Sequence, residues 1–440
     1  MRVHDAAVND LPEYLQQLTM GLAVELHQVL SDDNLSGAEV EEELTELMRE
    51  AGRKALGEGL SEKYGRHEGP RRLCPCGRIQ SFEGYRPIGV MTILGPVRFE
   101  RAYYRCADCG RTHYQGDEAL GLSEGRFSLP AQEAVSLVCS ELPFETGREM
   151  LGRLTGIEVS NSHAQHITDR HGQELERRAE IECEALFAGE LEMLPEGRPD
   201  RLYVTLDGLK MPFRDDWHET KIGALYDVRV GEDGVDEPRR VSYTSGAWES
   251  SEPFGRRLYQ EAAHRGIEWA QEQVAIADGA EWIWNLVDEH FPRAVQILDF
   301  YHATERLYAV GRAVYGDETD KVRKWAEANR ERLWEGRLSD VFRSLRNLKP
   351  ATEEGRETVR TAIGYYQQNR CRMDYPAYRA RGYHVGSGVV EAACKTVAAA
   401  RCKRSGMRWS KEGAQSVLAL RSQRLNGRWD NYWKPLKAAC

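Results

Sequence analysis

The chain has 440 residues, of which 41% are apolar and 30% are charged. This length predicts two to four domains, and the composition is typical of a globular protein. No apolar stretch reaches the length that a membrane-spanning helix needs, and the first ten residues lack the apolar segment of a signal peptide. We therefore expect a cytoplasmic protein that does not contact a membrane.

The net charge of −10 is unevenly distributed along the chain. Residues 361–440 hold 15 Lys and Arg against 4 Asp and Glu, a surplus of 11 positive charges, so the other 360 residues carry a net −21. Such an asymmetry favours a basic working surface near the C-terminal end. A solvated helical face has the same composition, so the charge alone leaves both readings open.

Residues 1 to about 60 have apolar side chains three and four positions apart, which predicts helices. Ser36, followed by acidic residues, is a plausible cap for the second of them.

Four of the ten cysteines form two close pairs around a predicted hairpin. The strand-like runs "VMTIL" and "VRFERAYYRC" lie on either side of Gly95-Pro96, a turn dipeptide. The hairpin would bring the two pairs together as a zinc ribbon with four thiolate ligands. The first pair departs from the usual spacing, since it is C-x-C, and four unrelated reduced cysteines are the alternative. The predicted zinc ligands are Cys74, Cys76, Cys106 and Cys109.

Residues 130–180 read as three successive helices with short breaks. The break "TGIEVSNS" would end one helix at Gly156 and start the next with Ser160 or Ser162 as its cap. This is the form of a helix-turn-helix motif, and a plain three-helix bundle is the alternative. The predicted base-contacting residues of the last helix are His163, Gln165 and His166.

From residue 200 the pattern changes to β-β-β-α-β-α-β. The first strand, "DRLYVTLDGLK", ends in Asp207-Gly208, the fourth carries Asp278 and the fifth carries Asp299. This order is that of a ribonuclease-H-like fold, in which the first and fourth strands are neighbours. Carboxylates on those two strands would meet at one edge of the sheet and hold divalent ions, so we expect Asp207 and Asp278, and not Asp299, to be the pair.

A third acid is expected after a long helical stretch. Ser387 would cap a helix over 388–403 and place Glu391 in its first turn, with Lys395 four residues on. The small apolar neighbours of Glu391 favour a catalytic role for this residue. A surface ion pair between Glu391 and Lys395 is the alternative.

At this point the sequence resembles the DDE transposases of bacterial insertion sequences, on the branch related to Mutator and hAT elements. The matching pieces are "TLDG", "ADGA", "LDFYH" and "GSGVVEAACK", with "RSGMRWS" and "NGRWDNYW" after them. The likeness covers roughly residues 70–440. Each motif is weak alone, whereas their order and spacing are quite specific.

The resemblance implies two-metal-ion phosphoryl transfer on DNA, with Mg²⁺ or Mn²⁺ held by Asp207, Asp278 and Glu391. Asp299 and His302 would be the C/D-x-x-H motif of that branch, which supports the site or positions DNA. Partners would be double-stranded DNA, at the element ends and the target, and further copies of the chain in a dimer or larger assembly. Basic residues expected on phosphates are Lys395, Arg401, Lys403, Arg404 and Arg408.

The predicted fold class is α+β multidomain: a ribonuclease-H-like α/β core with an all-α insertion, preceded by a zinc ribbon and a helical DNA-binding segment. The expected regions are an N-terminal helical part, the ribbon, the helix-turn-helix-like part, the first part of the core, the insertion, and the completion of the core with a basic tail. Their boundaries are 1–65, 66–120, 121–195, 196–302, 303–385 and 386–440.

Two other functions fit the same residues. A structure-specific nuclease on this fold would share the three acids and cut DNA without joining it. A domesticated DNA-binding protein would use the ribbon and the 130–180 helices and have an inactive core. A glycosidase with paired carboxylates is more remote, because it gives no role to the ribbon or the basic tail.

Overall fold

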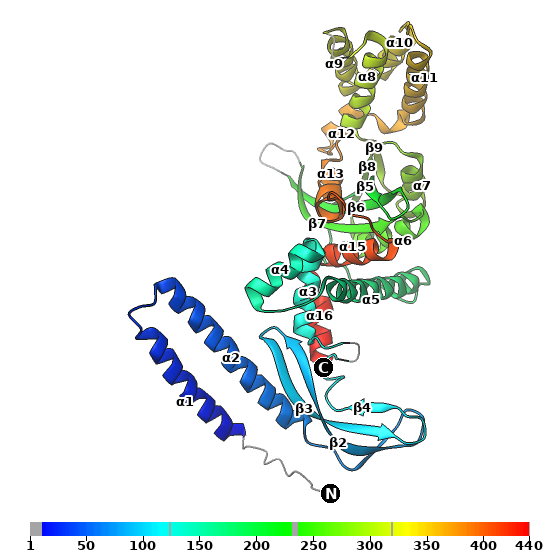
Figure 1. Cartoon of the computed structure of the whole chain (residues 1–440). Coiled ribbons are helices and arrows are strands. Elements are labelled where there is room, and N and C mark those ends of the chain that lie inside the picture. Colours follow the sequence, from blue (N-terminus) through cyan, green and yellow to red (C-terminus); the bar gives the residue numbers. More distant parts are fainter. Residues whose placement is uncertain (1–10, 123–124, 231–235, 318–319, 440) are drawn as a thin grey trace. The chain divides into compact units, whose positions relative to one another are not determined.

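The computed structural model describes residues 11–122, 125–230, 236–317 and 320–439 (Figure 1). They form a mixed α+β protein that divides into two compact units. The first unit comprises residues 1–168 and 430–440, and the second comprises residues 169–429. Across the described ranges, no helix has the length and apolar character needed to cross a membrane.

The first unit begins with two packed helices, α1 (Leu11–Leu30) and α2 (Gly37–Tyr64). Ser36 caps α2, as its sequence predicts: the Ser36 hydroxyl accepts a hydrogen bond from the Glu39 N–H, and the Glu39 carboxylate accepts one from the Ser36 N–H at 2.8 Å. This reciprocal pair is a capping box, and it satisfies two backbone donors at the start of the helix.

A four-stranded antiparallel sheet follows, in the order β1-β2-β3-β4. The hairpin of β2 and β3 pairs Thr92 with Gly95, so its turn is formed by Ile93 and Leu94 and not by the expected Gly95-Pro96 dipeptide. Gly95 instead begins β3 with a φ of 102°, which only glycine adopts easily. The strands are β1 (Arg71–Leu73), β2 (Ile79–Thr92), β3 (Gly95–Cys106) and β4 (Thr112–Tyr114).

Three helices come next: α3 (Leu129–Glu141), α4 (Phe144–Thr155) and α5 (Asn161–Phe187). Gly156 ends α4 in the left-handed conformation, and the Ser160 hydroxyl accepts a hydrogen bond from the N–H of His163 at the start of α5. Both features match the predicted helix-turn-helix break. The last helix, α16 (Trp429–Ala439), is joined to α3 by an ion pair between Lys437 and Glu133.

The second unit contains a five-stranded sheet in the order β7-β6-β5-β8-β9. β5 pairs antiparallel with β6, and β6 pairs antiparallel with β7. In contrast, β8 pairs parallel with both β5 and β9. The predicted neighbourhood of the first and fourth strands is therefore confirmed. The strands are β5 (Arg201–Pro212), β6 (Trp217–Val230), β7 (Asp236–Ala247), β8 (Glu272–Ala277) and β9 (Val295–Leu298).

Two strand boundaries differ from those that the sequence predicts. β5 does not end at Asp207-Gly208 but continues to Pro212, because β6 pairs with it as far as the Pro212–Trp217 pair. β9 ends at Leu298, so Asp299 is not a strand residue but the N-cap of the following helix.

Helices surround this sheet and share its core. α6 packs against β6 and β7, and α13 packs against β5 and β6. Buried side chains of the helices between residues 300 and 380 belong to the same apolar cluster as those of the central strands. The helices on either side of β8 are α6 (Ser251–His264) and α7 (Glu281–His290). The helices between β9 and residue 387 are α8 (Phe300–Tyr315), α9 (Asp320–Trp334), α10 (Leu338–Arg346), α11 (Glu353–Gln368) and α12 (Tyr375–Ala380). The helices after residue 387 in this unit are α13 (Gly388–Ala393), α14 (Ala400–Cys402) and α15 (Lys411–Leu425).

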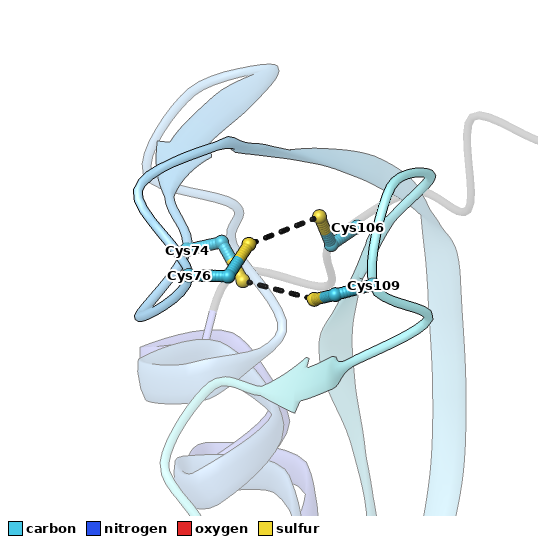
Figure 2. A group of neighbouring side chains, drawn as sticks. All are labelled: Cys74, Cys76, Cys106 and Cys109. Atoms are coloured by element: carbon cyan, nitrogen blue, oxygen red, sulfur yellow. Dashed lines mark hydrogen bonds between the residues drawn. The ribbon is translucent and has the colours of Figure 1, made fainter.

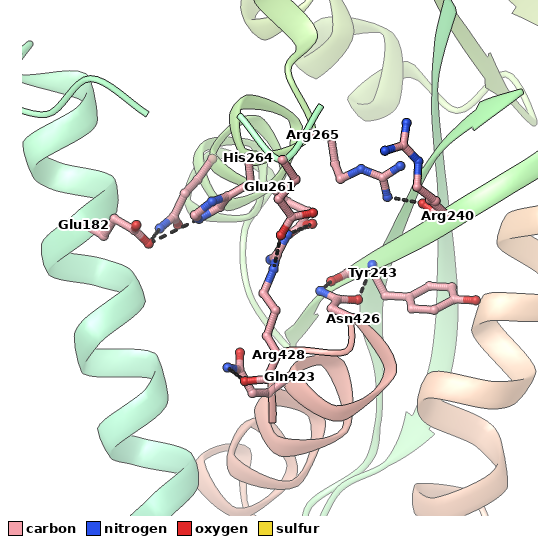
Figure 3. A network of polar contacts seen from close by, with 11 residues as sticks. Glu182, Arg240, Tyr243, Glu261, His264, Arg265, Gln423, Asn426 and Arg428 are labelled. Carbon is pink, nitrogen blue, oxygen red and sulfur yellow. Dashed lines mark hydrogen bonds and ion pairs between the residues drawn. The ribbon is translucent and has the colours of Figure 1, made fainter. Parts of the chain in front are cut away.

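An ion-pair network holds the end of α15 beside α6 (Figure 3). The Arg428 guanidinium binds both oxygens of Glu261, at 2.6 and 2.9 Å, and also contacts Glu196 at 2.8 Å. The Asn426 amide exchanges two hydrogen bonds with the backbone of Tyr243 on β7. These contacts fix the C-terminal part of this unit to the sheet that carries the acidic residues.

Candidate functional site

The four predicted zinc ligands lie together at one end of the four-stranded sheet (Figure 2). The sulfur atoms of Cys74 and Cys109 are 3.6 Å apart, and those of Cys76 and Cys106 are 3.8 Å apart. All four sulfurs lie within 4.8 Å of one another. Zinc–sulfur bonds of about 2.3 Å in a tetrahedron place the sulfurs about 3.8 Å apart, so this cluster could hold a metal such as zinc.

Each cysteine pair lies on a tight backbone turn that ends in a glycine. Gly77 follows the first pair with a φ of 83°, and Gly110 follows the second with a φ of 72°. The C-x-C spacing therefore makes a turn like that of C-x-x-C. The backbone N–H of Arg78 is the main cause that lowers the pKa of Cys76, to about 7. A thiol with this pKa loses its proton readily, as metal binding requires.

Three aspartates form a row across the parallel strands of the second sheet. The pairing of β5 with β8 joins Thr205 to Ile276, so Asp207 and Asp278, each two residues further on, lie at the same level. The pairing of β8 with β9 joins Ala277 to Leu298, which places Asp299 level with Asp278. Neighbouring strands are about 4.8 Å apart, so Asp278 is next to both of the other two.

Asp207 is half-buried on β5 and has a neighbour that its sequence context does not reveal. The Gly208 N–H donates to one of its carboxylate oxygens at 2.7 Å, and the Cys394 thiol donates to the other at 3.5 Å. Burial raises the pKa of Asp207, and the negative charge of Asp278 adds to the rise. A second carboxylate this close to Asp207 adds negative charge that a bound cation would offset.

Asp278 begins the turn after β8. Its carboxylate accepts a hydrogen bond from the Ala280 N–H at 2.9 Å, and its backbone carbonyl accepts one from the Tyr365 hydroxyl at 2.7 Å. Gly279 has a φ of 97°, and a Cβ added to it would lie 2.7 Å from the Tyr365 ring. The glycine of the "ADGA" motif is therefore required by both the backbone and the close approach of α11.

Asp299 and His302 form a hydrogen-bonded pair at the start of α8. The Asp299 side chain is fully buried and accepts hydrogen bonds from the backbone N–H groups of His302 and Ser387. The Nδ1 atom of His302 lies 3.3 Å from the Asp299 carboxylate. The hydrogen bond to Asp299 is the main cause that raises the pKa of His302, to about 9, so the imidazole is protonated at neutral pH.

The pKa of Asp299 is lowered by the same contacts. Burial alone would raise it, but the hydrogen bonds from His302 and Ser387 outweigh the burial. His302 is then a positive group placed among acids, where it offsets part of their mutual repulsion.

Glu391 lies on α13, and its carboxylate is within 4.8 Å of ligand atoms of Asp299 and His302. Asp207 and Asp278 are not members of this group of three, although the sequence predicts that Glu391 joins them. The expected continuous helix over 388–403 is also interrupted, because residues Cys394–Ala399 form a π-helix. This widened turn presents Cys394 to Asp207, and π-turns of this kind are frequent at functional sites.

The alternative for Glu391, an ion pair with Lys395, is not found among the described residues. The nearest polar side chain that contacts its carboxylate is Ser387, whose hydroxyl is 3.5 Å away.

The basic residues after Glu391 occupy two different environments. Lys395, Lys403, Arg404 and Arg408 are exposed. Arg401 is only 1% exposed, and its guanidinium lies over the ring of Trp409 at 5.0 Å. A buried guanidinium cannot reach a phosphate at the surface, so the predicted role on DNA does not fit Arg401 in this structure.

The three predicted base-contacting residues lie in the first turns of α5. His166 is exposed, whereas His163 and Gln165 are half-buried. The His163 ring stacks on Phe127 with 4.8 Å between ring centroids. Of the three side chains, that of His166 is the most open to solvent.

The sequence did not predict two contacts of the acidic site. One is the contact of Cys394 with Asp207, and the other is the hydrogen bond from the Ser387 backbone N–H to Asp299. Cys394 lies three residues after Glu391 in "GSGVVEAACK", which is the only signal that the sequence offers for it. Ser387 was expected as a side-chain cap, but its backbone N–H and not its hydroxyl makes the buried contact, with Asp299.

Comparisons with known proteins identify one family. The family model described as "Uncharacterised protein family (UPF0236)" matches residues 30–433. A UPF0236 protein of Caldanaerobacter subterraneus subsp. tengcongensis, TTE2489, is 25% identical over 344 residues, which are 76% of this chain and 68% of the relative. A second from that organism, TTE0402, is 25% identical over 349 residues, and the match spans 76% of this chain and 64% of the relative.

A third relative from the same organism is 25% identical over 345 residues, which are 76% of this chain and 67% of the relative. Its name joins eleven locus designations, from TTE0033 to TTE2212.

Proposed function

The chain belongs to the uncharacterised protein family UPF0236, and we propose that it is a DNA transposase with a DDE triad. It would cut and join the ends of an insertion sequence by metal-dependent phosphoryl transfer. The sheet order β7-β6-β5-β8-β9, with β5 parallel to β8, supports a ribonuclease-H-like core.

The observation that carries the proposal is the placement of Asp207 and Asp278. The two residues are level on neighbouring parallel strands, and burial, with the charge of Asp278 as a smaller cause, raises the pKa of Asp207. α13, which bears Glu391, packs against β5. Three carboxylates from two strands and one helix offer oxygen ligands, which Mg²⁺ prefers and Mn²⁺ accepts.

In this proposal Asp207, Asp278 and Glu391 hold the ions. When bound, the ions would supply Lewis acidity at the attacking and leaving oxygens of the DNA phosphate. Asp299 engages the Nδ1 side of His302, which leaves the Nε2 atom to donate a hydrogen bond to a phosphate oxygen. Asp299 itself orients His302 and the Ser387 backbone and is not one of the triad.

Double-stranded DNA is the proposed partner. The exposed Lys395, Lys403, Arg404 and Arg408 would neutralise phosphates of the bound DNA, and His166 on α5 would contact DNA from the first unit. Two copies of the chain would each hold one element end, as in transposases generally.

One comparison also favours a mobile element. The relative with eleven locus designations bears a name that places it at many positions in one genome. A gene that repeatedly inserts copies of itself would produce such a distribution, whereas a nuclease or a single domesticated gene would not.

The test is an excision and joining assay with purified protein and a plasmid that carries this gene with its flanking DNA. With Mg²⁺ we expect both broken element ends and products in which those ends are joined to new DNA. With Mg²⁺ left out and no chelator added, or with Asp207→Asn, we expect neither.

Cut ends without joined products would instead favour the nuclease. DNA binding with neither cutting nor joining in Mg²⁺ or Mn²⁺ would contradict the proposal and favour the DNA-binding protein with an inactive core.

A further inference from the structure

Exposed aromatic rings lie at the tip of the β5–β6 hairpin and beside it, at the end of β7. Trp217, the first residue of β6, is 44% exposed, and Trp248, directly after β7, is 39% exposed. Large aromatic side chains are costly to leave in water. The rings therefore need an explanation that the acidic site does not provide.

The position of Trp248 is fixed by its neighbours. Its ring stacks on His218 with 3.7 Å between centroids and only 7° between planes. Asp215 accepts a hydrogen bond from the Nε2 atom of His218 at 2.8 Å, which fixes the imidazole. Behind them lies Phe213, which is fully buried and 5.4 Å from Trp248.

The backbone at Trp248 is also unusual. Its φ of 46° is in the left-handed region, and among the described residues Arg240 is the one other non-glycine there. Such a conformation is strained for a residue with a side chain and persists only where the surroundings enforce it. The stack on His218 and the strained backbone therefore hold the exposed Trp248 ring in one orientation.

Positive charge lies beside these rings. The Lys403 Nζ atom is 5.5 Å from the centroid of the Trp217 ring. The segment that follows Lys403 is tied to the hairpin by two backbone hydrogen bonds: Arg214 N–H to the Trp409 carbonyl at 2.9 Å, and Trp409 N–H to the Pro212 carbonyl at 3.1 Å. Arg404 and Arg408 are exposed on that segment.

The distance from this surface to the acidic site follows from the strand. Trp217 pairs with Pro212, five residues beyond Asp207 on the same strand. At about 3.3 Å per residue this separation is about 17 Å. One DNA strand that extends over a few nucleotides can therefore reach from the acidic site to these rings.

We propose that Trp217, His218, Trp248 and Lys403, here called the tryptophan patch, bind unpaired nucleotides of a DNA strand. The two tryptophan rings stack on bases, and Lys403 with its basic neighbours contacts the phosphates. A duplex offers no base faces to such rings, so the ligand is single-stranded or opened DNA. The proposal rests on the proposed function, since it gives that enzyme a second DNA contact about 17 Å from the cut.

The experiment measures binding of the full chain to a fluorescent oligothymidine of about twenty nucleotides and to a matched duplex. Mg²⁺ and Mn²⁺ are left out throughout and no chelator is added, so the cysteine cluster stays intact and binding needs no ion at the acidic site. Trp217→Ala and Trp248→Ala are compared with Trp269→Ala, which removes another exposed tryptophan of the same unit, 51% exposed, away from the hairpin. Trp217→Phe keeps an aromatic face.

We expect the Kd for the single strand to rise by about fivefold or more in each alanine variant of the patch. The Kd for the duplex should change little, and Trp269→Ala and Trp217→Phe should bind as the wild type does. Lys403→Ala should weaken binding. It should also lower the slope of log Kd against log salt concentration by about the amount that one phosphate contact contributes.

Three results would overturn the proposal: no single-strand binding by the wild type, equal losses for single strand and duplex, or wild-type affinity in Trp217→Ala. A wild type that instead binds an oligosaccharide through the same two tryptophans would overturn it as well. If Trp248→Ala does not fold, Trp217→Ala and Lys403→Ala decide the question, because both side chains are exposed.

Failure here and failure of the proposed function are distinguishable. If the protein excises and joins DNA but does not bind the single strand, only the proposal for the tryptophan patch is wrong. If the protein binds the single strand but does not excise DNA, the proposal for the patch stands and the proposed transposase function is wrong.

Discussion

The two β-sheets of this chain hold their candidate functional side chains by different means. In the first unit the apolar cluster at the sheet has four buried members, Tyr64, Val90, Phe99 and Leu122, and near the cysteines Leu73 is 70% exposed and Ile79 is 48% exposed. In the second unit the strands with the aspartates lie in a large core that continues into the helices between residues 300 and 380.

The difference follows from the chemistry of the ligands. Four thiolates around a metal provide the energy that fixes their own loops, so a small sheet with little core is sufficient. Neighbouring carboxylates repel one another and need a scaffold that is stable without the metal. This difference predicts that removal of a metal unfolds the first sheet, whereas a cavity in the apolar core destabilises the second.

The largest effect is expected from removal of the metal that the cysteine cluster would hold. Binding of a structural zinc ion contributes about 10–16 kcal/mol in small zinc domains. A chelator, or Cys106→Ser, should therefore abolish the hydrogen-exchange protection of the amides in β1 to β4 while protection in β5 and β8 remains.

The control is Cys371→Ser, since Cys371 is an exposed cysteine outside the cluster. Unchanged protection in β2 and β3 after complete removal of metal would show that this sheet is self-sufficient and would contradict the comparison.

The next effect should come from a cavity in the second core. Phe254 on α6 is fully buried in that cluster, and Phe254→Ala should reduce the free energy of unfolding of this unit by about 3–5 kcal/mol. Urea unfolding followed by exchange in β5 measures it, and zinc content should stay that of the wild type.

Leu194→Ala is the matched control, because Leu194 is 88% exposed and its truncation should change the stability by less than about 0.5 kcal/mol. Loss of zinc from Phe254→Ala would mean that the two sheets depend on each other.

A smaller effect is expected at Glu272, at the start of β8. Its carboxylate accepts hydrogen bonds from Arg201, Arg381 and Tyr383. Burial raises its pKa, but these three partners outweigh burial and lower the pKa to about 2.

A pKa that is lower in the folded than in the unfolded protein stabilises the fold above the unfolded value of about 4.3. This stabilisation disappears as the pH falls from there toward 2. Glu272→Gln should therefore cost about 1 kcal/mol at pH 7, and the difference from the wild type in urea unfolding should shrink by pH 3. A difference that is equal at both pH values would mean that the charge of Glu272 does not matter.

The sequence was informative wherever local chemistry decides the structure. The cysteine spacing around a hairpin predicted the cluster, and Gly156 and Ser160 predicted the ends of two helices. The order of strands and helices predicted that β5 and β8 are neighbours, because few topologies accommodate that order.

Features that depend on contacts between distant segments were not predicted. The extension of β5 past Asp207 depends on its partner strand, and the bond between Cys394 and Asp207 depends on a π-turn that periodicity cannot reveal. The approach of Glu391 to His302 likewise joins residues on α13 and α8. Burial of Arg401 beneath Trp409 was hidden by a run of basic residues that looks uniformly exposed in the sequence.

The central claim is that Asp207 and Asp278, and not Asp299, make the metal site with Glu391. It is tested most directly by the excision and joining assay with Mg²⁺ on the wild type, Asp278→Asn and Asp299→Asn. We predict a loss of at least about a thousandfold in Asp278→Asn, as for a missing metal ligand, and a loss of about 10–100-fold in Asp299→Asn, as for a residue that orients its neighbours. Full loss in Asp299→Asn with substantial activity in Asp278→Asn would contradict the account and place the metal at the Asp299, His302 and Glu391 group.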